Sequence, residues 1–237
     1  MGGVVPVSNV NAGEGLDADA SVLLGYAPSR DDGRHADGGR ELILGEHARL
    51  RSGSVLYLGS RVGARFQTGH NVVIREDCSI GDDVCIWSNS VIDYGCRIGD
   101  GVKIHSNCYI AQFTEIGPDA FLAPGVTIAN DLYPGQQASA WVMAGPWIGA
   151  GAQIGVNVTI LPYVRIGAGS LIGAGANIVR DIPDGAVAYG NPATVRGKVD
   201  DLAPIESRII AVPKSASRYR FTSRTSGRRI QQDGMSP

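Results

Sequence analysis

The sequence predicts an all-β fold, a parallel β-helix, and three observations lead to that fold class. Aliphatic residues recur at every sixth position from Leu44 to Ile128, and only Thr68 interrupts the series. The same period resumes at Ile148 and continues to Ile178. A glycine follows every third member, at Gly45, Gly63, Gly81, Gly99, Gly117, Gly149 and Gly167. A helix repeats at 3.6 residues and a strand at 2, so a period of six indicates hexads stacked into a solenoid.

Hexads grouped in threes form coils of eighteen residues, and about seven coils are expected between Leu44 and Pro183. The glycines fix the start of each coil, where a positive φ or a close backbone approach would exclude a side chain. Ile116 and Ile148 lie 32 positions apart, which exceeds one coil by 14 residues. A loop at 134–147 is therefore expected to leave the third face of the fifth coil.

Two segments flank the repeat. Residues 1–40 show no sustained period and are expected to be irregular, although a short strand around Val22–Leu24 could cap the first coil. The β-helix is expected over residues 41–197, and residues 198–237 form a C-terminal extension. The extension ends in a basic stretch typical of a solvated tail, with Arg218, Arg220, Arg224, Arg228 and Arg229.

Composition disfavours several functional classes. The net charge of −2 gives no general attraction for nucleic acid. No apolar run approaches the roughly 20 residues of a membrane helix, and the N-terminus lacks the pattern of an export signal, so a cytoplasmic location is expected. Cys78, Cys96 and Cys108 fall at inward positions and no CxxC pair occurs, which predicts buried thiols rather than metal ligands or disulfides.

The repeat, the loop and the closing segment together resemble the hexapeptide-repeat acyltransferases over roughly residues 42–197. Asn177–Ala193 reads NIVRDIPDGAVAYGNPA and looks like the segment that closes the acetyl-CoA-dependent members. Val126–Gly135 reads VTIANDLYPG and is similar to the start of the loop in bacterial N-acetyltransferases of nucleotide-linked amino sugars. The resemblance implies a left-handed β-helix, acetyl-CoA as co-substrate, and a homotrimer whose active sites lie between neighbouring solenoids.

Acyl transfer requires a nucleophile, a proton acceptor and donors for the developing oxyanion. His70 and His105 both follow second-face residues, two coils apart, so they are expected on one edge of the solenoid. His70 lies where members of the resembled family often carry a histidine base, and His105 lies nearer the loop. Some members use no protein base and let the departing thiolate take the proton. Both histidines therefore remain candidates.

Candidate binding residues fall into three groups. Asn71 and Asn107 lie at corners, where asparagine also favours left-handed turns. Asn130 and Asp131 open the loop and could bind the amine or hydroxyls of a sugar, or cap a turn. For coenzyme A, the later coils offer small residues for a trough and basic residues for phosphates: Gly155, Ala168, Gly173, Ala174, Arg180, Arg196 and Lys198.

The leading interpretation is an N-acetyltransferase that acts on a nucleotide-linked amino sugar. The nearest alternative is an O-acyltransferase that acts on the hydroxyl of a sugar or small metabolite. A zinc enzyme like the γ-class carbonic anhydrases would need three histidine ligands, and no histidine follows His105, so no metal is expected. A non-catalytic scaffold is the remaining alternative.

Overall fold

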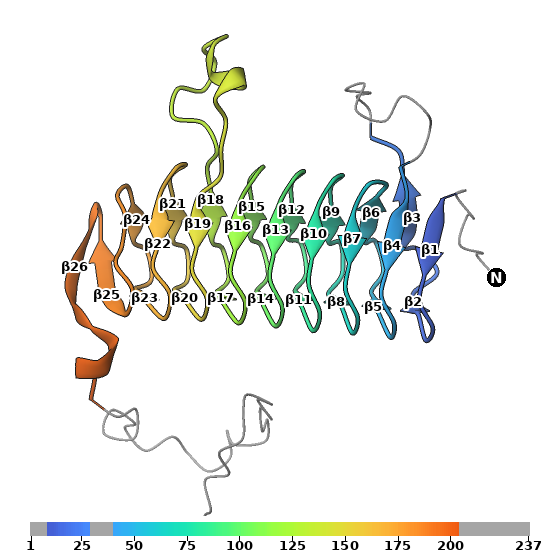
Figure 1. The fold of residues 1–237 in the computed structure, drawn as a ribbon, viewed down its shortest axis with the longest axis horizontal. Coiled ribbons are helices and arrows are strands. Elements are labelled where there is room, and N and C mark those ends of the chain that lie inside the picture. The colour runs from blue at the N-terminus through green and yellow to red at the C-terminus, as the bar shows by residue number, and fades with distance from the viewer. Residues whose placement is uncertain (1–8, 29–39, 204–237) are drawn as a thin grey trace, which may run out of the picture. The chain divides into compact units, whose positions relative to one another are not determined.

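A computed structural model describes residues 9–28 and 40–203. Residues up to Asp201 belong to one compact unit, and a second unit begins at Leu202. Short strands of the first unit stack coil upon coil into a solenoid (Figure 1). The basic stretch noted near the C-terminus lies outside the described residues.

Three sheets run along the solenoid, and from β1 to β24 successive strands enter the first, second and third sheet in turn. The first sheet contains β1 (Val10–Ala12), β4 (Leu42–Leu44), β7 (Arg61–Val62), β10 (Ser79–Ile80), β13 (Arg97–Ile98), β16 (Glu115–Ile116), β19 (Trp147–Ile148) and β22 (Arg165–Ile166). The second contains β2 (Asp17–Ala18), β5 (Arg49–Leu50), β8 (Gln67–Thr68), β11 (Cys85–Ile86), β14 (Lys103–Ile104), β17 (Phe121–Leu122), β20 (Gln153–Ile154), β23 (Leu171–Ile172), β25 (Ala186–Gly190) and β26 (Ala193–Lys198). The third contains β3 (Leu23–Tyr26), β6 (Val55–Tyr57), β9 (Val73–Ile74), β12 (Val91–Ile92), β15 (Tyr109–Ile110), β18 (Thr127–Ile128), β21 (Thr159–Ile160) and β24 (Asn177–Ile178).

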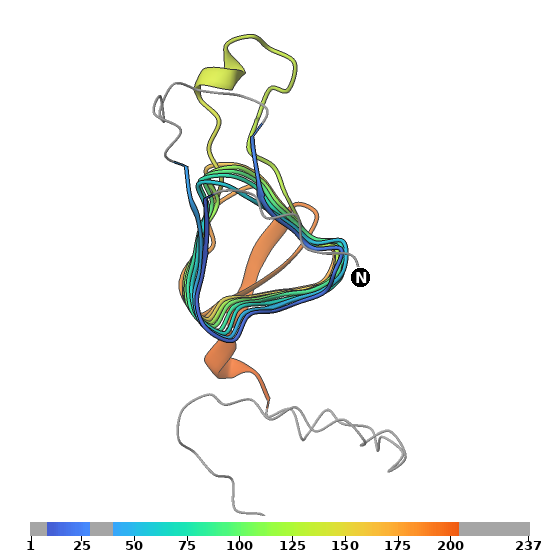
Figure 2. The same cartoon turned by 90° about the vertical axis from the view of Figure 1, so that its right-hand side faces the viewer.

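Each regular coil is eighteen residues long, since Ser79 pairs with Arg97 and Arg97 pairs with Glu115. The coils superpose as a triangle when viewed along the stack (Figure 2). The prediction of a left-handed parallel β-helix is thus confirmed. The corners of the triangle are numbered by the sheets that they join. The first corner joins the first and second sheets, the second corner joins the second and third sheets, and the third corner joins the third and first sheets.

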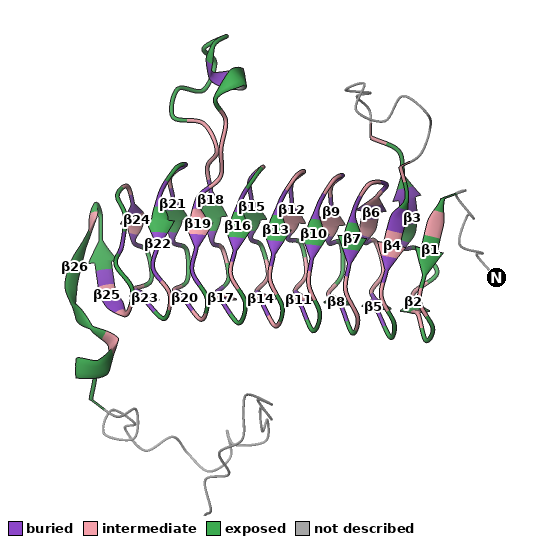
Figure 3. Cartoon of the chain, in the orientation of Figure 1, coloured by how far each residue is buried: buried purple, intermediate pink, exposed green. Residues whose placement is uncertain are grey.

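The hexad residues from Leu44 to Ile178 are buried, and Figure 3 shows buried residues recurring in the strands of successive coils. Ile74, Ile104 and Ile110 are completely buried, and together the hexads form one continuous core. Thr68, the exception in the series, is also buried. Its Oγ1 accepts a hydrogen bond from the Arg51 backbone N–H at 2.9 Å and lies 3.2 Å from Ser54 Oγ. The core therefore tolerates this polar atom because it has partners.

The cysteine prediction is confirmed for the described part of the chain. Cys78, Cys96 and Cys108 are buried and carry free thiols. The Sγ atoms of Cys78 and Cys96 each lie 3.1 Å from a backbone carbonyl oxygen of the next coil. Burial raises the pKa of the Cys108 thiol above its ordinary value. These residues behave as small core side chains.

The first-face glycines are required by close approach between coils. A Cβ atom on Gly99 would lie 2.6 Å from the backbone nitrogen of Pro118, and one on Gly117 would lie 2.6 Å from that of Ala150. Such distances are well inside van der Waals contact. Of the two explanations that the sequence leaves open, the coil-to-coil approach is the one observed.

Residues 9–28 are more regular than expected. Strands β1, β2 and β3 form a complete coil that pairs in parallel with the coil of β4, β5 and β6. Val10 pairs with Leu42, 32 positions later, so this coil is followed by 14 extra residues. Ala12, Ala18 and Leu24 do keep the period of six. The two alanines and the insertion concealed this coil in the sequence.

Two features complete the fold. The chain leaves the third corner after β18, passes through the short 3₁₀ helix η1 (Ser139–Trp141) and returns at β19, so the predicted loop projects from this corner (Figures 1 and 2). At the end of the stack, β25 pairs in parallel with β23 and folds back antiparallel as β26. The short 3₁₀ helix η2 (Val199–Asp201) follows at the end of the first unit.

The inward position of the hexad residue can be tested with one core variant. Ile74→Ala removes a fully buried side chain, so the free energy of unfolding is expected to fall by about 2–5 kcal/mol in urea titrations. Val156→Ala is the control, because Val156 is 43% exposed and its truncation is expected to cost less than about 0.5 kcal/mol. Equal losses in the two variants would contradict the assignment of inner and outer faces.

Candidate functional site

The candidate residues lie on different corners of the solenoid. His70, Asn71, His105 and Asn107 follow strands of the second sheet and lie at the second corner. Asn130 and the loop that it opens lie at the third corner. The third sheet separates the two corners by one hexad, which is up to about 20 Å of extended chain. A single chain therefore does not bring the histidines and the start of the loop together.

His105 is held between aromatic rings at the second corner. Its imidazole stacks on Trp87, with ring centroids 4.4 Å apart and planes 9° apart, and contacts Phe121 at 5.3 Å in a tilted arrangement. Burial lowers the pKa of His105 from its ordinary value of 6.5. At neutral pH the ring is therefore uncharged and able to accept a proton.

His70 has a different environment on the same corner. Its side chain is exposed, and Nδ1 lies 2.7 Å from Ser52 Oγ in the preceding coil. Its backbone N–H donates to Ser88 Oγ at 3.0 Å. The ring of His70 thus bonds toward the N-terminal end of the stack, whereas His105 lies two coils closer to the loop. The two candidates therefore differ in exposure and in hydrogen-bond partners, and which of them acts as a base stays a prediction.

The asparagine column has a clear role in the backbone. Asn71, Asn89 and Asn107 have φ values of 56°, 61° and 61°, in the left-handed region. Asn71 Nδ2 also donates to Asn89 Oδ1 at 3.2 Å, along the stack. Gly125 and Gly175 occupy the same place in later coils, also with positive φ. These asparagines therefore shape the corner, and binding of substrate by Asn71 and Asn107 stays a prediction.

The residues predicted for coenzyme A are only partly brought together. Gly155, Gly173 and Ala174 lie at the second corner, in the coils that follow His105, whereas Ala168 lies at the first corner and Arg180 at the third. Arg196 and Lys198 are exposed on β26. Tyr189 of β25 packs against Gly173, where an added Cβ atom would lie 2.7 Å from Tyr189 Cβ. The Arg196 guanidinium lies 5.5 Å from the Tyr189 ring.

Asn130 and Asp131 hold the loop in place. Asn130 Nδ2 donates to Gln112 Oε1 at 2.6 Å and lies 3.2 Å from Met143 Sδ, and its backbone carbonyl accepts from Ala144 N–H at 3.2 Å. Asp131 accepts the Tyr133 backbone N–H at 2.7 Å and the Ser139 hydroxyl at 2.8 Å. Asp131 therefore caps the turn that begins the loop, and Asn130 joins the two sides of the loop's base.

A buried polar network, which the repeat pattern does not predict, extends from Asn130 along the third corner. Asp93 is only 5% exposed, and Oδ2 accepts from Tyr109 Oη at 2.7 Å and from Gln112 Nε2 at 2.6 Å. Burial and the hydrogen bond to Asp93 raise the pKa of Tyr109 to about 12. The only signal in the sequence was an aspartate directly after the inward Ile92, where the next coil has Ala111.

Arg75 connects this network to a second carboxylate. Arg75 donates to both oxygens of Glu76 at 2.8 Å, and its NH1 lies 3.4 Å from Asp93 Oδ1. The guanidinium also lies 5.2 Å from the ring centroid of Tyr57. Two mostly buried carboxylates thus share one arginine, which satisfies the rule that buried charges are paired.

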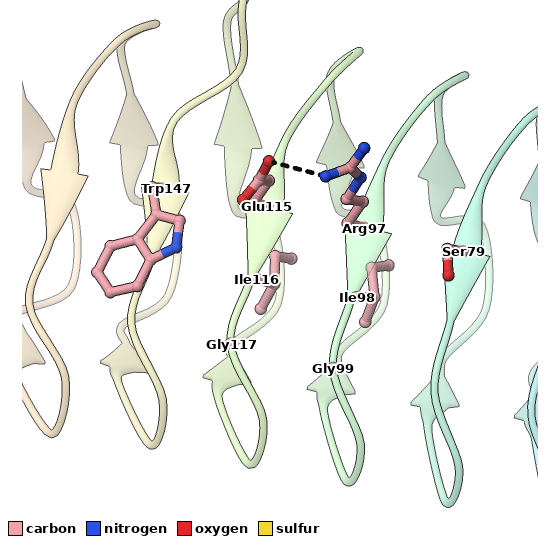
Figure 4. A pocket seen from close by; sticks show the side chains of 8 residues that line it. All are labelled: Ser79, Arg97, Ile98, Gly99, Glu115, Ile116, Gly117 and Trp147. Carbon is pink, nitrogen blue, oxygen red and sulfur yellow. Dashed lines mark ion pairs between the residues drawn. The ribbon is translucent and has the colours of Figure 1, made fainter.

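A shallow depression of about 300 Å³ lies on the outer face of the first sheet (Figure 4). It is lined by the indole of Trp147 and by an ion pair in which Arg97 NH1 lies 3.7 Å from Glu115 Oε1. Trp147 also contacts Arg165, whose guanidinium lies 4.7 Å from the ring. The depression contains none of the candidate residues, and its Arg97–Glu115 pair is exposed to solvent.

The described residues contain neither a cluster of metal-binding side chains nor a membrane-spanning helix. Within 9–28 and 40–203, no three histidine, cysteine or carboxylate side chains gather closely enough to hold a metal ion. No helix in the same part of the chain is long and apolar enough to cross a membrane.

Family models recognise most of the regular coils. The bacterial transferase hexapeptide model, described as six repeats, matches residues 59–93, 95–130 and 145–180. The model for the hexapeptide repeat of succinyl-transferase matches residues 77–112. The gap between residues 130 and 145 corresponds to the loop at the third corner.

Individual relatives are more distant. Galactoside O-acetyltransferase of Lactococcus lactis subsp. lactis (strain IL1403) is 35% identical over 90 residues, which are 36% of this chain and 44% of that protein. This chain thus spans less than half the length of the curated relative. PerB from Caulobacter crescentus, solved with CoA and GDP-perosamine, is 26% identical over 58% of this chain and 57% of that chain, with a TM-score of 0.29. UDP-N-acetylglucosamine acyltransferase from Campylobacter jejuni is 19% identical over 85% and 80%, with a TM-score of 0.43.

The role of the asparagine column can be tested at Asn107. Asn107→Gly keeps a residue that adopts positive φ freely, so the free energy of unfolding is expected to change by less than about 0.5 kcal/mol. Asn107→Ala places a Cβ atom in the left-handed region and is expected to cost about 1–2 kcal/mol. Urea titrations of the two variants measure the difference. An equal loss in both would show that the side chain, rather than the backbone conformation, stabilises the corner.

The environment of His105 can be tested by removing its stacking partner. Trp87→Ala opens the ring to water, which reduces the penalty on the charged form, so the pKa of His105 is expected to rise toward 6.5. Titration of the imidazole signals by NMR measures this value. Trp141→Ala is the control, because Trp141 is 88% exposed in the loop. An unchanged pKa in Trp87→Ala would contradict burial by the indole as the cause.

Proposed function

We propose that the protein is an acyltransferase, because the bacterial transferase hexapeptide model matches most of its regular coils. In this proposal an acetyl group moves from acetyl-CoA to the amino group of a nucleotide-linked amino sugar. The choice of an amine rests on the similarity of Val126–Gly135 to the start of the loop in bacterial N-acetyltransferases of nucleotide-linked amino sugars. The structural observation that supports an acceptor group with a hydrogen to donate is the side chain of Asn130 at the base of the loop. Its Nδ2 group is bonded within the protein, which leaves Oδ1 to accept a hydrogen bond from an amine.

The proposed reaction needs one bond to form and one to break. The amine nitrogen attacks the thioester carbonyl to form the C–N bond, the C–S bond breaks, and coenzyme A departs as a thiolate that is then protonated to the thiol. The proton released by the amine goes to an acceptor in the site or to the departing thiolate. His105 is the proposed acceptor, because its lowered pKa keeps the ring neutral at pH 7. His70 is retained as the second candidate for this role.

An active site that uses both His105 and Asn130 requires more than one copy of the chain. The two residues lie on different corners, so the second corner of one copy would face the loop of another. The loop is suited to such a contact because it carries large exposed apolar side chains: Leu132, Tyr133, Trp141 and Val142. We therefore propose a homotrimer, in which three such clefts would be equivalent under cyclic symmetry.

Acetyl-CoA is proposed to bind along the second corner, from His105 toward the end of the stack. Gly155, Gly173 and Ala174 leave little side chain there, so backbone groups can approach a pantetheine arm. Arg196 and Lys198 are the proposed phosphate contacts near the end of this line. Ala168 and Arg180 lie on the other corners and could contribute only from a neighbouring copy. The need for acetyl-CoA favours a cytoplasmic location.

The second candidate function is transfer of the acetyl group to a hydroxyl. The specific observation in its favour is the local likeness to a galactoside O-acetyltransferase, 35% identical over 90 residues. A hydroxyl group also donates a hydrogen bond, so Asn130 Oδ1 could accept it equally well. A neutral amine attacks with its lone pair, whereas a hydroxyl group must lose its proton to a base as it attacks. A base such as His105 would therefore be more important for transfer to a hydroxyl.

One assay separates these functions. The protein is incubated with acetyl-CoA and with dTDP- and UDP-linked amino sugars, or with the corresponding hydroxyl sugars, and release of the free thiol is followed. Release with the amino sugars alone is expected, and His105→Ala is expected to lower kcat about 10²- to 10⁴-fold if the ring is the base. His47→Asn is the matched control, because His47 is exposed at the first corner with a positive φ that asparagine tolerates.

The outcomes assign the function directly. Thiol release with hydroxyl sugars only would replace the leading proposal by the second one. Full activity of His105→Ala would indicate that the departing thiolate takes the proton or that His70 does. No release with any acceptor would count against both functions.

A further inference from the structure

Three side chains at the third corner form a directional chain of hydrogen bonds that ends at the loop. Gln112 Nε2 donates to Asp93 Oδ2 at 2.6 Å, and Asn130 Nδ2 donates to Gln112 Oε1 at 2.6 Å. We propose that Asp93 and Gln112 are positioning residues, which fix the Asn130 amide with its carbonyl oxygen toward the acceptor. This inference rests on the proposed function, and it adds that the site selects an acceptor group with an N–H or O–H to donate.

Asp93, at the buried end of this series, determines the direction of the hydrogen bonds. A carboxylate has only acceptor atoms, so whatever Gln112 turns toward Asp93 must be its NH₂ group. Asp93 cannot rotate to relieve this requirement, because Oδ1 accepts the Tyr94 backbone N–H at 2.8 Å and lies 3.4 Å from Arg75 NH1. The Tyr109 hydroxyl holds Oδ2 from another side at 2.7 Å. Both carboxylate oxygens are thus occupied by donors.

The orientation of the Gln112 amide in turn determines the orientation of the Asn130 amide. With the NH₂ group of Gln112 bonded to Asp93, only Oε1 faces Asn130, and only the NH₂ group of Asn130 can bond to it. The carbonyl oxygen of Asn130 is left pointing away from the chain of bonds. No described residue donates to that oxygen in a side-chain hydrogen bond. The orientation of Asn130 is therefore determined by a carboxylate two coils away.

The backbone of Asn130 is also held in place. Asn130 lies just after β18, where the loop begins, and its carbonyl accepts a hydrogen bond from Ala144 N–H on the returning side of the loop at 3.2 Å. Met143, also on the returning side, contacts Nδ2 at 3.2 Å. A hydrogen-bond acceptor is thus held on a rigid support at the base of a projecting loop, which is the arrangement that positions a substrate.

This arrangement predicts which acceptor groups are rejected. An amine or hydroxyl donates to Asn130 Oδ1, whereas a keto group would place two acceptor oxygens against each other and leave both without a donor. A freely rotating asparagine would turn its NH₂ group to such a ligand. An asparagine locked through Gln112 and Asp93 does not.

Two variants and a control test the inference. Asp93→Asn allows the direction of the hydrogen bonds to reverse, because an amide at position 93 can donate to Gln112. Gln112→Met removes the hydrogen bonds to Asp93 and Asn130 while keeping the length of the side chain. Gln67→Met is the control, since Gln67 is exposed on the second sheet. The first measurement is hydrogen exchange of side-chain NH₂ groups by NMR. Gln112 and Asn130 are expected to exchange several-fold more slowly than Gln67 in the wild-type protein, and Asp93→Asn is expected to remove this protection.

The second measurement is steady-state kinetics with the amino-sugar acceptor. Gln112→Met is expected to raise the KM for the acceptor about tenfold, the effect of one lost hydrogen bond, while the KM for acetyl-CoA changes less than about twofold. The keto analogue of the acceptor is expected to inhibit Gln112→Met more strongly than the wild-type protein. A structural defect alone would not strengthen the binding of a ligand.

Each result has a defined meaning. Exchange of the Gln112 and Asn130 amides as fast as that of Gln67 in the wild-type protein would overturn the inference, whether or not the protein is active. An unchanged acceptor KM in Gln112→Met, with normal wild-type turnover, would overturn it as well. Absence of turnover with every acceptor would instead count against the proposed function, and the exchange measurement would still decide whether Asp93 fixes Asn130.

Discussion

The register of one coil on the next is the constraint on which this molecule depends. Most strands contribute only two residues, so each is held by hydrogen bonds to the coils on either side, such as that from Lys103 N–H of β14 to the Ala120 carbonyl at 3.0 Å. A residue eighteen positions away is therefore a direct neighbour, and a side chain at a corner always faces the same corner of the next coil. The corner on which each candidate side chain lies follows from this register and from the inward direction of the aliphatic residue in each hexad.

The same register explains how much of the fold could be predicted. The aliphatic period and the first-face glycines were sufficient for the β-helix, for the buried Cys78, Cys96 and Cys108, and for the loop before Trp147. The aliphatic period does not predict the first coil, because alanines occupy two of its inward positions and because Val10 pairs with a residue 32 positions later. A period is visible in a sequence only where its members are large and uninterrupted.

The site was predicted less completely, for a physical reason. Position along the repeat places His105 on the second corner and Asn130 on the third, and both placements follow from counting. The stack of His105 on Trp87 and the hydrogen bonds of Asp93 depend on how side chains turn at the corners, which the period does not determine. Asp93 and Gln112 are 19 positions apart, one more than the repeat, so counting by eighteen does not put them together.

The two interruptions of the stack have a common geometry. Val10 pairs with Leu42 and Glu115 pairs with Trp147, and in both cases the offset is 32 residues where the regular coil has 18. Both extra segments depart after a strand of the third sheet and return before a strand of the first. The coils above and below stay in register, so this corner accepts added chain without disturbing the core. The third corner is consequently the insertion point of the scaffold, where a foreign segment could be grafted or the loop at 134–147 exchanged while the β-helix stays unchanged.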